Sequence, residues 1–365
     1  MKKLCLIYQR KVAEHDFGPN HPLRADRLAL YVQKLHSDKL VDRLGLSIVD
    51  HALEVSDEDI LAAHEQSLLD QIKQLSVEGG WLDGDTPVPL GTYERTKLQA
   101  GGLLYGFEAV LTGQYHRALQ NLAFGGHHAM RRHGRITFGF CYFNQEAIVI
   151  RRLQREKKLE KALILDCDCH HGNGIQDIFY DDPSVLYISL HQDPRTLYPS
   201  MMGYVEETGE GRGKGYNVNV PLPPGTTRNS YLEALSEIFP PLALEFSPDI
   251  ILFIINGDTH FMDPLTGLSL DLKTYPIATD MVNKVANEVC GGKMVSETAG
   301  GYDPKVAISC ACAITAALAE DENYQAEDPY GDQEDEAPHV TEQVKRVVSV
   351  VKERHAPYWR CFRAT

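Results

Sequence analysis

Two apolar runs in this sequence end in side chains that can bind a metal ion. The first run, residues 163–165, leads into Asp166, Asp168 and His170, which alternate with two cysteines. Because successive residues of a strand point to opposite faces, the three polar side chains share one face and the cysteines lie on the packed side. An Asp and a His two residues apart at a strand end can both reach one divalent ion. The alternative, a pair of strand-end caps before a turn, would bury carboxylates without compensation, which is costly.

The second run, residues 251–255, is followed by Asn256, Gly257 and Asp258. Alone, Asp258 could equally be the N-cap of a helix. Together with the first run it is better explained as a third ligand, and two carboxylates with one imidazole leave coordination positions open for water and substrate. We therefore expect one catalytic zinc ion, or alternatively an iron ion, held by Asp168, His170 and Asp258.

Two further motifs carry groups that can transfer a proton or donate a hydrogen bond. A Gly-Gly turn precedes His127 and His128, and two adjacent imidazoles suit general acid–base catalysis, although a lone histidine is more often structural. A second Gly-Gly turn precedes Tyr302, whose phenol can donate a hydrogen bond to the oxyanion of a tetrahedral intermediate. By itself, the second motif predicts only a turn.

Strands and helices alternate along the segments that must position these residues. Apolar runs predict strands at 162–165, 185–190, 249–255 and 293–295, after a first strand near the N-terminus. Three- and four-residue apolar spacing predicts helices at 94–112, 144–157, 231–246, 281–289 and 305–318. This alternation is typical of an α/β fold with a doubly wound parallel sheet flanked by helices, in which ligands bind at the carboxyl ends of the strands.

The whole chain, residues 1–365, is expected to form a single domain. Residues 320–336 are dense in Asp and Glu and are expected to be a solvated linker to a C-terminal helix at 340–354 that packs back on the domain.

Composition excludes several classes of protein. The net charge of −15 and the lack of long basic runs argue against nucleic-acid binding, and no apolar run approaches the ~20 residues that cross a bilayer. The N-terminal apolar stretch is shorter than the ~7 residues of a signal-peptide core, and the eight cysteines are expected to be reduced and mostly buried. We therefore expect a cytoplasmic enzyme that does not bind membranes. The sequence leaves the oligomeric state open.

Taken in order, these motifs resemble the histone deacetylase superfamily, which includes acetoin-utilization proteins and acetylpolyamine amidohydrolases. The resemblance begins at His21, passes through residues 125–144, 166–174, 187–192, 216–221 and 258–264, and ends at Tyr302. It implies the arginase/deacetylase fold and zinc-dependent hydrolysis of an acetyl amide.

The resemblance also implies a role for each residue near the metal. His128 would be the general base, His127 would assist as an acid or an electrostatic partner, and Tyr302 would polarise the acetyl carbonyl. Asp166 would support His127. Asn173 stands where class I enzymes carry an Asp, so His128 is expected to be less basic than in those enzymes.

Potassium and substrate sites are implied in the same way. Asp166, Ser189 and the backbone of Leu190 would bind a structural potassium ion. A second monovalent site would use the carbonyls of Phe179, Asp182 and Val185. The residues implied for substrate binding line the channel or its rim: Phe140, Tyr198, Asp85, Gly139 and Gly301.

Two other functions fit the sequence less well. A binuclear manganese hydrolase of the arginase type would need a second bridging carboxylate where this chain has Gly172. A non-catalytic acetyl-lysine reader would lack His128 or Tyr302, and both are present. The expected substrate is acetyl-lysine in a protein or peptide, and the alternative is an acetylpolyamine or another small acetylated amine. Residues 199–203 and 256–259 depart from the usual motifs, which weakens any transfer of substrate preference.

Overall fold

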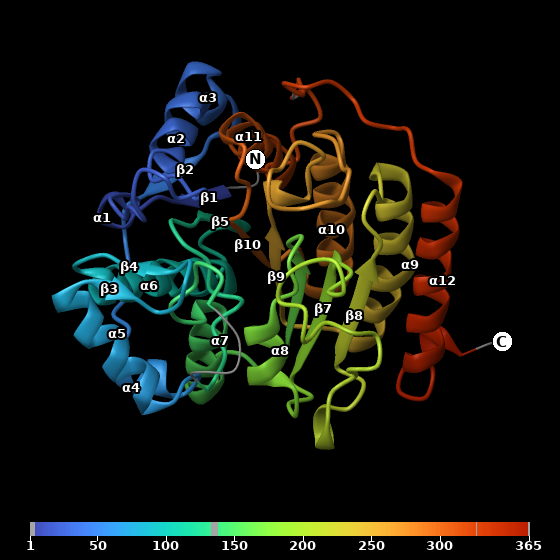
Figure 1. Ribbon diagram of the computed structural model, residues 1–365, viewed down its shortest axis with the longest axis horizontal. Helices are drawn as coiled ribbons and strands as arrows, with labels where there is room; N and C mark the ends of the chain where they lie inside the picture. Colours follow the sequence, from blue (N-terminus) through green and yellow to red (C-terminus); the bar gives the residue numbers. More distant parts are fainter. Residues whose placement is uncertain (1–3, 133–137, 326, 364–365) are drawn as a thin grey trace.

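The computed structural model describes residues 4–132, 138–325 and 327–363. Its centre is an eight-stranded parallel sheet with the order β2-β1-β5-β10-β9-β6-β7-β8 (Figure 1). The strands are β1 (Leu4–Ile7), β2 (Ser47–Val49), β5 (Arg117–Asn121), β6 (Ala162–Cys167), β7 (Val185–Gln192), β8 (Asn217–Leu222), β9 (Ile250–Ile255) and β10 (Met294–Thr298). A short antiparallel hairpin, β3 (Gly80–Trp81) and β4 (Pro87–Val88), stands apart from this sheet. The predicted parallel α/β fold is confirmed.

Alternate side chains of the central strands belong to two hydrophobic cores, one on each face of the sheet. In β6, Leu163 and Leu165 join one core, whereas Ala162 and Ile164 join the other. Because both faces are covered by helices, these strands are apolar throughout instead of alternating with polar residues. The cysteines that alternate with Asp166 and Asp168 lie in the first core, as predicted.

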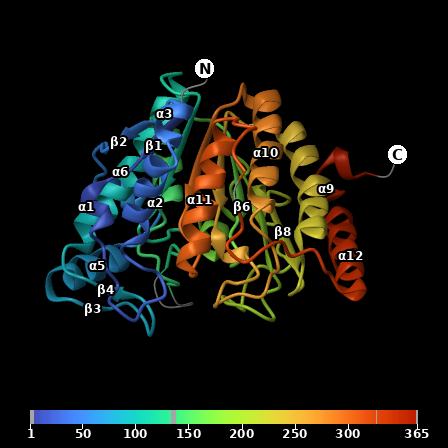
Figure 2. The same ribbon diagram turned by 90° about the horizontal axis from the view of Figure 1, so that it is seen from above.

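A row of helices covers each face of the sheet. One face carries α2 (Arg27–Ser37), α11 (Pro304–Leu318), α10 (Thr274–Cys290), α9 (Arg228–Phe246) and α12 (Pro338–His355), which Figure 2 shows in this order. The other face carries α5 (Gln66–Glu78), α6 (Thr92–Leu111), α7 (Gln145–Arg155) and α8 (Asn173–Phe179). The short helices are α1 (Arg10–Ala13), α3 (Leu40–Leu44) and α4 (Asp57–Leu61).

The predicted helices are found, but one of them begins earlier than expected. The apolar pattern predicted a start at residue 281, whereas α10 begins at Thr274. Pro276 lies in the first turn, where a missing backbone N–H removes no hydrogen bond within the helix. The proline therefore marks the beginning of the helix and not a break before it.

The acidic segment 320–336 runs from α11 to α12 without a helix or strand in its described part. Some of its carboxylates bond to the domain. Asp328 accepts the backbone N–H of Leu272 at 2.8 Å, and Glu336 accepts that of Thr227 at 2.6 Å. Within the described part of the chain, no helix combines the length and apolar character needed to span a membrane.

Candidate metal and catalytic site

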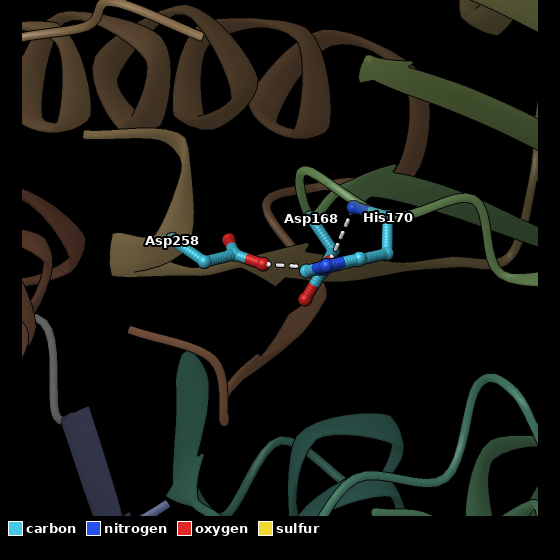
Figure 3. Close-up of side chains that lie close together, drawn as sticks. All are labelled: Asp168, His170 and Asp258. Atoms are coloured by element: carbon cyan, nitrogen blue, oxygen red, sulfur yellow. Dashed lines mark hydrogen bonds and ion pairs between the residues drawn. The ribbon is translucent and has the colours of Figure 1, made fainter. Parts of the chain in front are cut away.

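Asp168, His170 and Asp258 meet at the carboxyl edge of the sheet. Asp168 and His170 directly follow β6, and Asp258 lies in a 3-10 turn, Gly257–Thr259, that follows β9. Because β6 and β9 are paired up to their last residues, Cys167 and Ile255, the segments that leave them start side by side. Figure 3 shows the Asp258 carboxylate directed toward the His170 ring, with Asp168 beside that ring.

The three side chains offer donor atoms at distances that suit one ion. His170 Nδ1 lies 3.1 Å from Asp168 Oδ1 and 3.0 Å from Asp258 Oδ2. All three residues are buried, and their ligand atoms lie within 4.8 Å of one another. Two buried carboxylates repel each other unless a cation lies between them. The donor set therefore fits a divalent ion. Within the described ranges, no other set of three or more His, Cys, Asp or Glu residues comes this close.

His127 and His128 lie beside this group and have different partners. His127 Nδ1 is 3.1 Å from Asp166 Oδ2, and His128 Nδ1 is 2.7 Å from Asn173 Oδ1. An amide oxygen only accepts hydrogen bonds, so His128 donates from Nδ1. In the neutral ring Nε2 is then unprotonated and free to accept a proton.

The electrostatic surroundings of the two imidazoles also differ, in a direction that agrees with their hydrogen-bond partners. Burial, with the positive charges of His127 and His170, holds the pKa of His128 well below its usual value. Burial alone would also lower the pKa of His127, but Asp166 and Asp168 raise it to about 9. These surroundings favour the neutral form of His128 and the protonated form of His127.

Tyr302 reaches the site from the segment after β10. Its backbone N–H donates to Asp263 Oδ2 at 2.8 Å, and its ring centroid lies 6.4 Å from that of His170 and 5.9 Å from that of Phe140. Burial, followed by the charges of Asp258 and Asp168, raises the pKa of the phenol well above its usual value. The hydroxyl stays protonated and can donate a hydrogen bond.

Aromatic rings wall the approach to the metal group. The Tyr198 ring lies 4.8 Å from that of His128 and almost perpendicular to it. Gly139 lies between them at φ +53°, and a Cβ there would approach His128 Cδ2 to 2.5 Å. Phe140 adopts a left-handed φ of +65°, which is unusual for a non-glycine residue. A cavity of about 30 Å³ is lined in common by His127, His128, Phe140, Asp168, Asn256 and Tyr302.

The remaining predicted rim residues lie at different depths. Asp85 is exposed in the β3–β4 loop, and its carbonyl accepts from His21 Nε2 at 3.2 Å. Thr86 Oγ1 in the same loop accepts the backbone N–H of Phe140 at 3.2 Å, so this loop contacts the channel wall. Gly301 is buried instead, and a Cβ there would meet Ala307 Cβ at 3.2 Å.

The predicted potassium ligands lie in and beside β6 and β7. Asp166 and Ser189 are paired across the two strands, and the Ser189 hydroxyl bonds to His191 Nδ1 at 2.8 Å. Leu190 can offer only its backbone carbonyl oxygen to an ion, because its side chain is apolar, and that side chain lies in the hydrophobic core. At the second predicted site, the Phe179 carbonyl accepts from the Asp182 N–H at 3.0 Å, and the Asp182 carbonyl accepts from Val185.

Sequence reasoning missed a pair of buried carboxyl groups near His127. Gln145 Nε2 donates to Glu297 Oε1 at 3.2 Å and to Glu146 Oε1 at 3.5 Å. Burial raises the pKa of Glu146 to about 7 and that of Glu297 well above its usual value. The sequence does contain one sign of this pair, because Glu297 is a charged residue inside the buried strand β10.

The sequence matches the histone deacetylase domain over residues 21–318. The chain belongs to the histone deacetylase family. The resemblance inferred from its motifs is thereby confirmed, and the chain is a deacetylase. Histone deacetylases are zinc-dependent, and the buried Asp168, His170 and Asp258 form a group that can hold such an ion.

Several proteins are similar to this chain over most of their length. A probable deacetylase of Archaeoglobus fulgidus is 35% identical over 370 aligned positions, which cover 98% of this chain and 99% of the relative. The acetoin utilization protein AcuC of Bacillus subtilis is 34% identical and covers 83% of this chain and 78% of its own. A histone deacetylase-like amidohydrolase of Pseudomonas aeruginosa is 36% identical, over 72% of this chain and 68% of the relative. The crystal structure of the HDA15 HD domain superposes with a TM-score of 0.83 at 25% identity, covering 99% and 97% of the two chains.

Proposed function

We propose that this deacetylase removes acetyl groups from lysine side chains of proteins or peptides, using one zinc ion held by Asp168, His170 and Asp258. The observation that carries the proposal is the convergence of these three donors with His128, beside the rings of Phe140 and Tyr198. A narrow aromatic channel fits a linear acylated amine.

The chain's own residues supply the groups for amide hydrolysis. His128, held by Asn173 with Nε2 unprotonated, takes the proton of the attacking water as general base. Tyr302 donates a hydrogen bond to the developing oxyanion, and the charged His127 stabilises negative charge or protonates the leaving amine. When bound, zinc acts as a Lewis acid that polarises the acetyl carbonyl.

The rim supports a protein or peptide substrate over a small amine. Between Asp85 and Gly125 the chain consists of β4, α6 and β5 with short connections, and no long inserted loop closes the mouth. Asp85 is exposed in the β3–β4 loop, and we propose that its carboxylate binds the backbone N–H groups of a peptide. Acetylpolyamines remain the second candidate, because a chain of net charge −15 attracts cations.

One assay separates the two substrate classes. The kcat/KM values for an acetyl-lysine peptide, acetylspermidine and acetylputrescine measure differential transition-state binding. We expect the peptide to be the best substrate. A preference of about tenfold or more for either polyamine, roughly 1.4 kcal/mol, would overturn the choice of substrate and leave the deacetylase assignment intact.

Removing the metal tests the cofactor. Chelation should abolish activity, added Zn²⁺ should restore it, and elemental analysis should give one divalent ion per chain. Two ions per active chain would favour a binuclear hydrolase. The structural potassium ion near Asp166, Ser189 and Leu190 should appear as greater thermal stability in K⁺ than in an equal concentration of Na⁺.

The cysteines support the expected cytoplasmic location. All eight are free and seven of them are buried, which suits a compartment that keeps thiols reduced.

A further inference from the structure

Asn256 is buried directly after β9, two residues before Asp258. Its side-chain amide has a partner at each end. Nδ2 donates to Asp168 Oδ2, and Oδ1 accepts the backbone N–H of Ala299 at 2.6 Å. One carboxamide therefore connects a candidate metal ligand after β6 with the segment after β10 that leads to Tyr302.

The two oxygens of Asp168 have different surroundings. Oδ1 accepts the backbone N–H of His170 at 2.7 Å and lies beside the His170 ring, whereas Oδ2 accepts from Asn256. A carboxylate with a donor on each oxygen cannot rotate about its last torsion without breaking a bond. The orientation of Asp168 is therefore fixed before any ion arrives.

The hydrogen bond from Ala299 to Asn256 holds the segment after β10 near the two carboxylates. Gly300 packs against both carboxylates, because a Cβ there would lie 3.1 Å from Asp168 Oδ2 and 3.1 Å from Asp258 Oδ2. The Gly300 carbonyl also accepts the N–H of Gly257 at 3.2 Å. The Asn256 amide and this backbone bond together hold the segment that precedes Tyr302 against the ligands.

We infer that Asn256 is a positioning residue that orients Asp168 for the metal ion and fixes the Tyr302 segment relative to it. The inference rests on the proposed function, because it takes Asp168 as a metal ligand. Partners that orient metal ligands typically contribute 10–100-fold in metal affinity or activity. Asn256→Ala removes both hydrogen bonds, and Asn256→Leu removes them while nearly keeping the volume of the side chain.

Metal binding is measured with Co²⁺ alone, by competition with a chromophoric chelator and by the visible absorption of bound Co²⁺. We expect both variants to bind Co²⁺ at least tenfold more weakly and to show an altered Co²⁺ spectrum. Asn283→Ala is the matched control, because Asn283 is also buried and donates from Nδ2 to Ala317 at 2.8 Å, between α10 and the far end of α11. It should leave Co²⁺ affinity and spectrum unchanged.

A separate kinetic measurement tests whether Asn256 positions Tyr302. At saturating metal, Asn256→Leu should lower kcat about tenfold in the otherwise unchanged chain but much less in a Tyr302→Phe background, because the second substitution has already removed the group being positioned. Folded Asn256 variants with the affinity and spectrum of the unchanged chain would overturn the inference alone. If Asp168→Ala bound Co²⁺ as tightly as the unchanged chain does, Asp168 would not be a metal ligand. That result would overturn the proposed function as well.

Discussion

His127 and His128 are neighbours in the chain, yet their surroundings favour a positive charge on His127 and a neutral ring for His128. Asp166 behind His127 is a carboxylate, whereas Asn173 behind His128 is a neutral amide. A carboxylate stabilises an imidazolium, and an amide oxygen orients the ring without adding a charge. The pair thus presents one cation and one proton acceptor to the same small cavity.

Replacing each histidine separately should reveal this division. We expect His128→Ala to lose more turnover than His127→Ala on an unactivated acetyl-lysine peptide, because only the first substitution removes the proposed general base. Steady-state kcat values for the two purified variants, each with its metal content measured, give the comparison. If His128→Ala kept most of its activity, the two roles would have to be exchanged.

Removal of one hydroxyl tests the oxyanion donor. Tyr302→Phe should retain metal and fold but lose on the order of 10²-fold in kcat, the usual effect of deleting one such donor. Tyr330→Phe is the control, since its hydroxyl donates to the neighbouring Asp303 at 2.8 Å and not into the cavity. Near-normal turnover in Tyr302→Phe would make Tyr302 a turn residue only.

The cluster of candidate ligands could be predicted because each carboxylate follows an apolar run, and the carboxyl ends of parallel strands share one edge of the sheet. Asp168 and His170 alternate at the end of one apolar run, and Asp258 follows another. The bond from Asn256 to Asp168 could not be predicted, because it depends on β6 and β9 being adjacent in the sheet. Spacing along the chain carries no information about that order.

Among the elements, helix α9 obtains its N-terminal cap from a distant part of the chain. Its N-cap residue Thr227 makes no side-chain cap of its own. Instead Glu336 accepts the Thr227 backbone N–H at 2.6 Å and bonds to the hydroxyls of Ser230 and Thr341. The end of the acidic segment thereby joins the N-termini of α9 and α12.

Glu336→Ala should therefore destabilise the fold. Loss of hydrogen bonds to a charged, half-buried acceptor predicts a decrease of about 1–3 kcal/mol in the free energy of unfolding. Urea denaturation measures it, with Asp335→Ala, an exposed acidic neighbour, as the control. Equal stability of the two variants would mean that the segment is held elsewhere. Composition alone predicted a solvated run, because acidic density gives no sign of a partner more than 100 residues away.

On the scale of the whole molecule, buried neutral histidines make stability depend on pH. His64 Nδ1 donates to the carbonyl of Met130 at 2.9 Å, and Nε2 accepts the N–H of Asn144 at 2.8 Å. Protonation of Nε2 would break the second bond. Burial lowers the pKa of His64 to about 4.

The sign of the effect follows from proton uptake. Between about pH 6.5 and pH 4 the unfolded chain binds a proton at His64 that the folded chain does not, so stability falls as the pH is lowered through this window. From pH 7 to pH 5 this group alone should lower the free energy of unfolding by about 2 kcal/mol. Urea unfolding at both pH values should show a smaller loss in His64→Gln, whereas exposed His339→Gln should behave like the unchanged chain. An unaltered pH dependence in His64→Gln would contradict the argument.

The position of β10 determines when during synthesis the site can form. It is the last strand of the sheet in chain order, and it pairs with β5 on one side and β9 on the other. A nascent chain that ends before Met294 therefore holds two separate half-sheets, each with an unpaired central edge open to other chains. Asp168, His170 and Asp258 have been synthesised by then, but the Gly300 backbone that packs on their carboxylates has not. The protein therefore completes its candidate metal site late in synthesis, and until then those edges can pair with other chains.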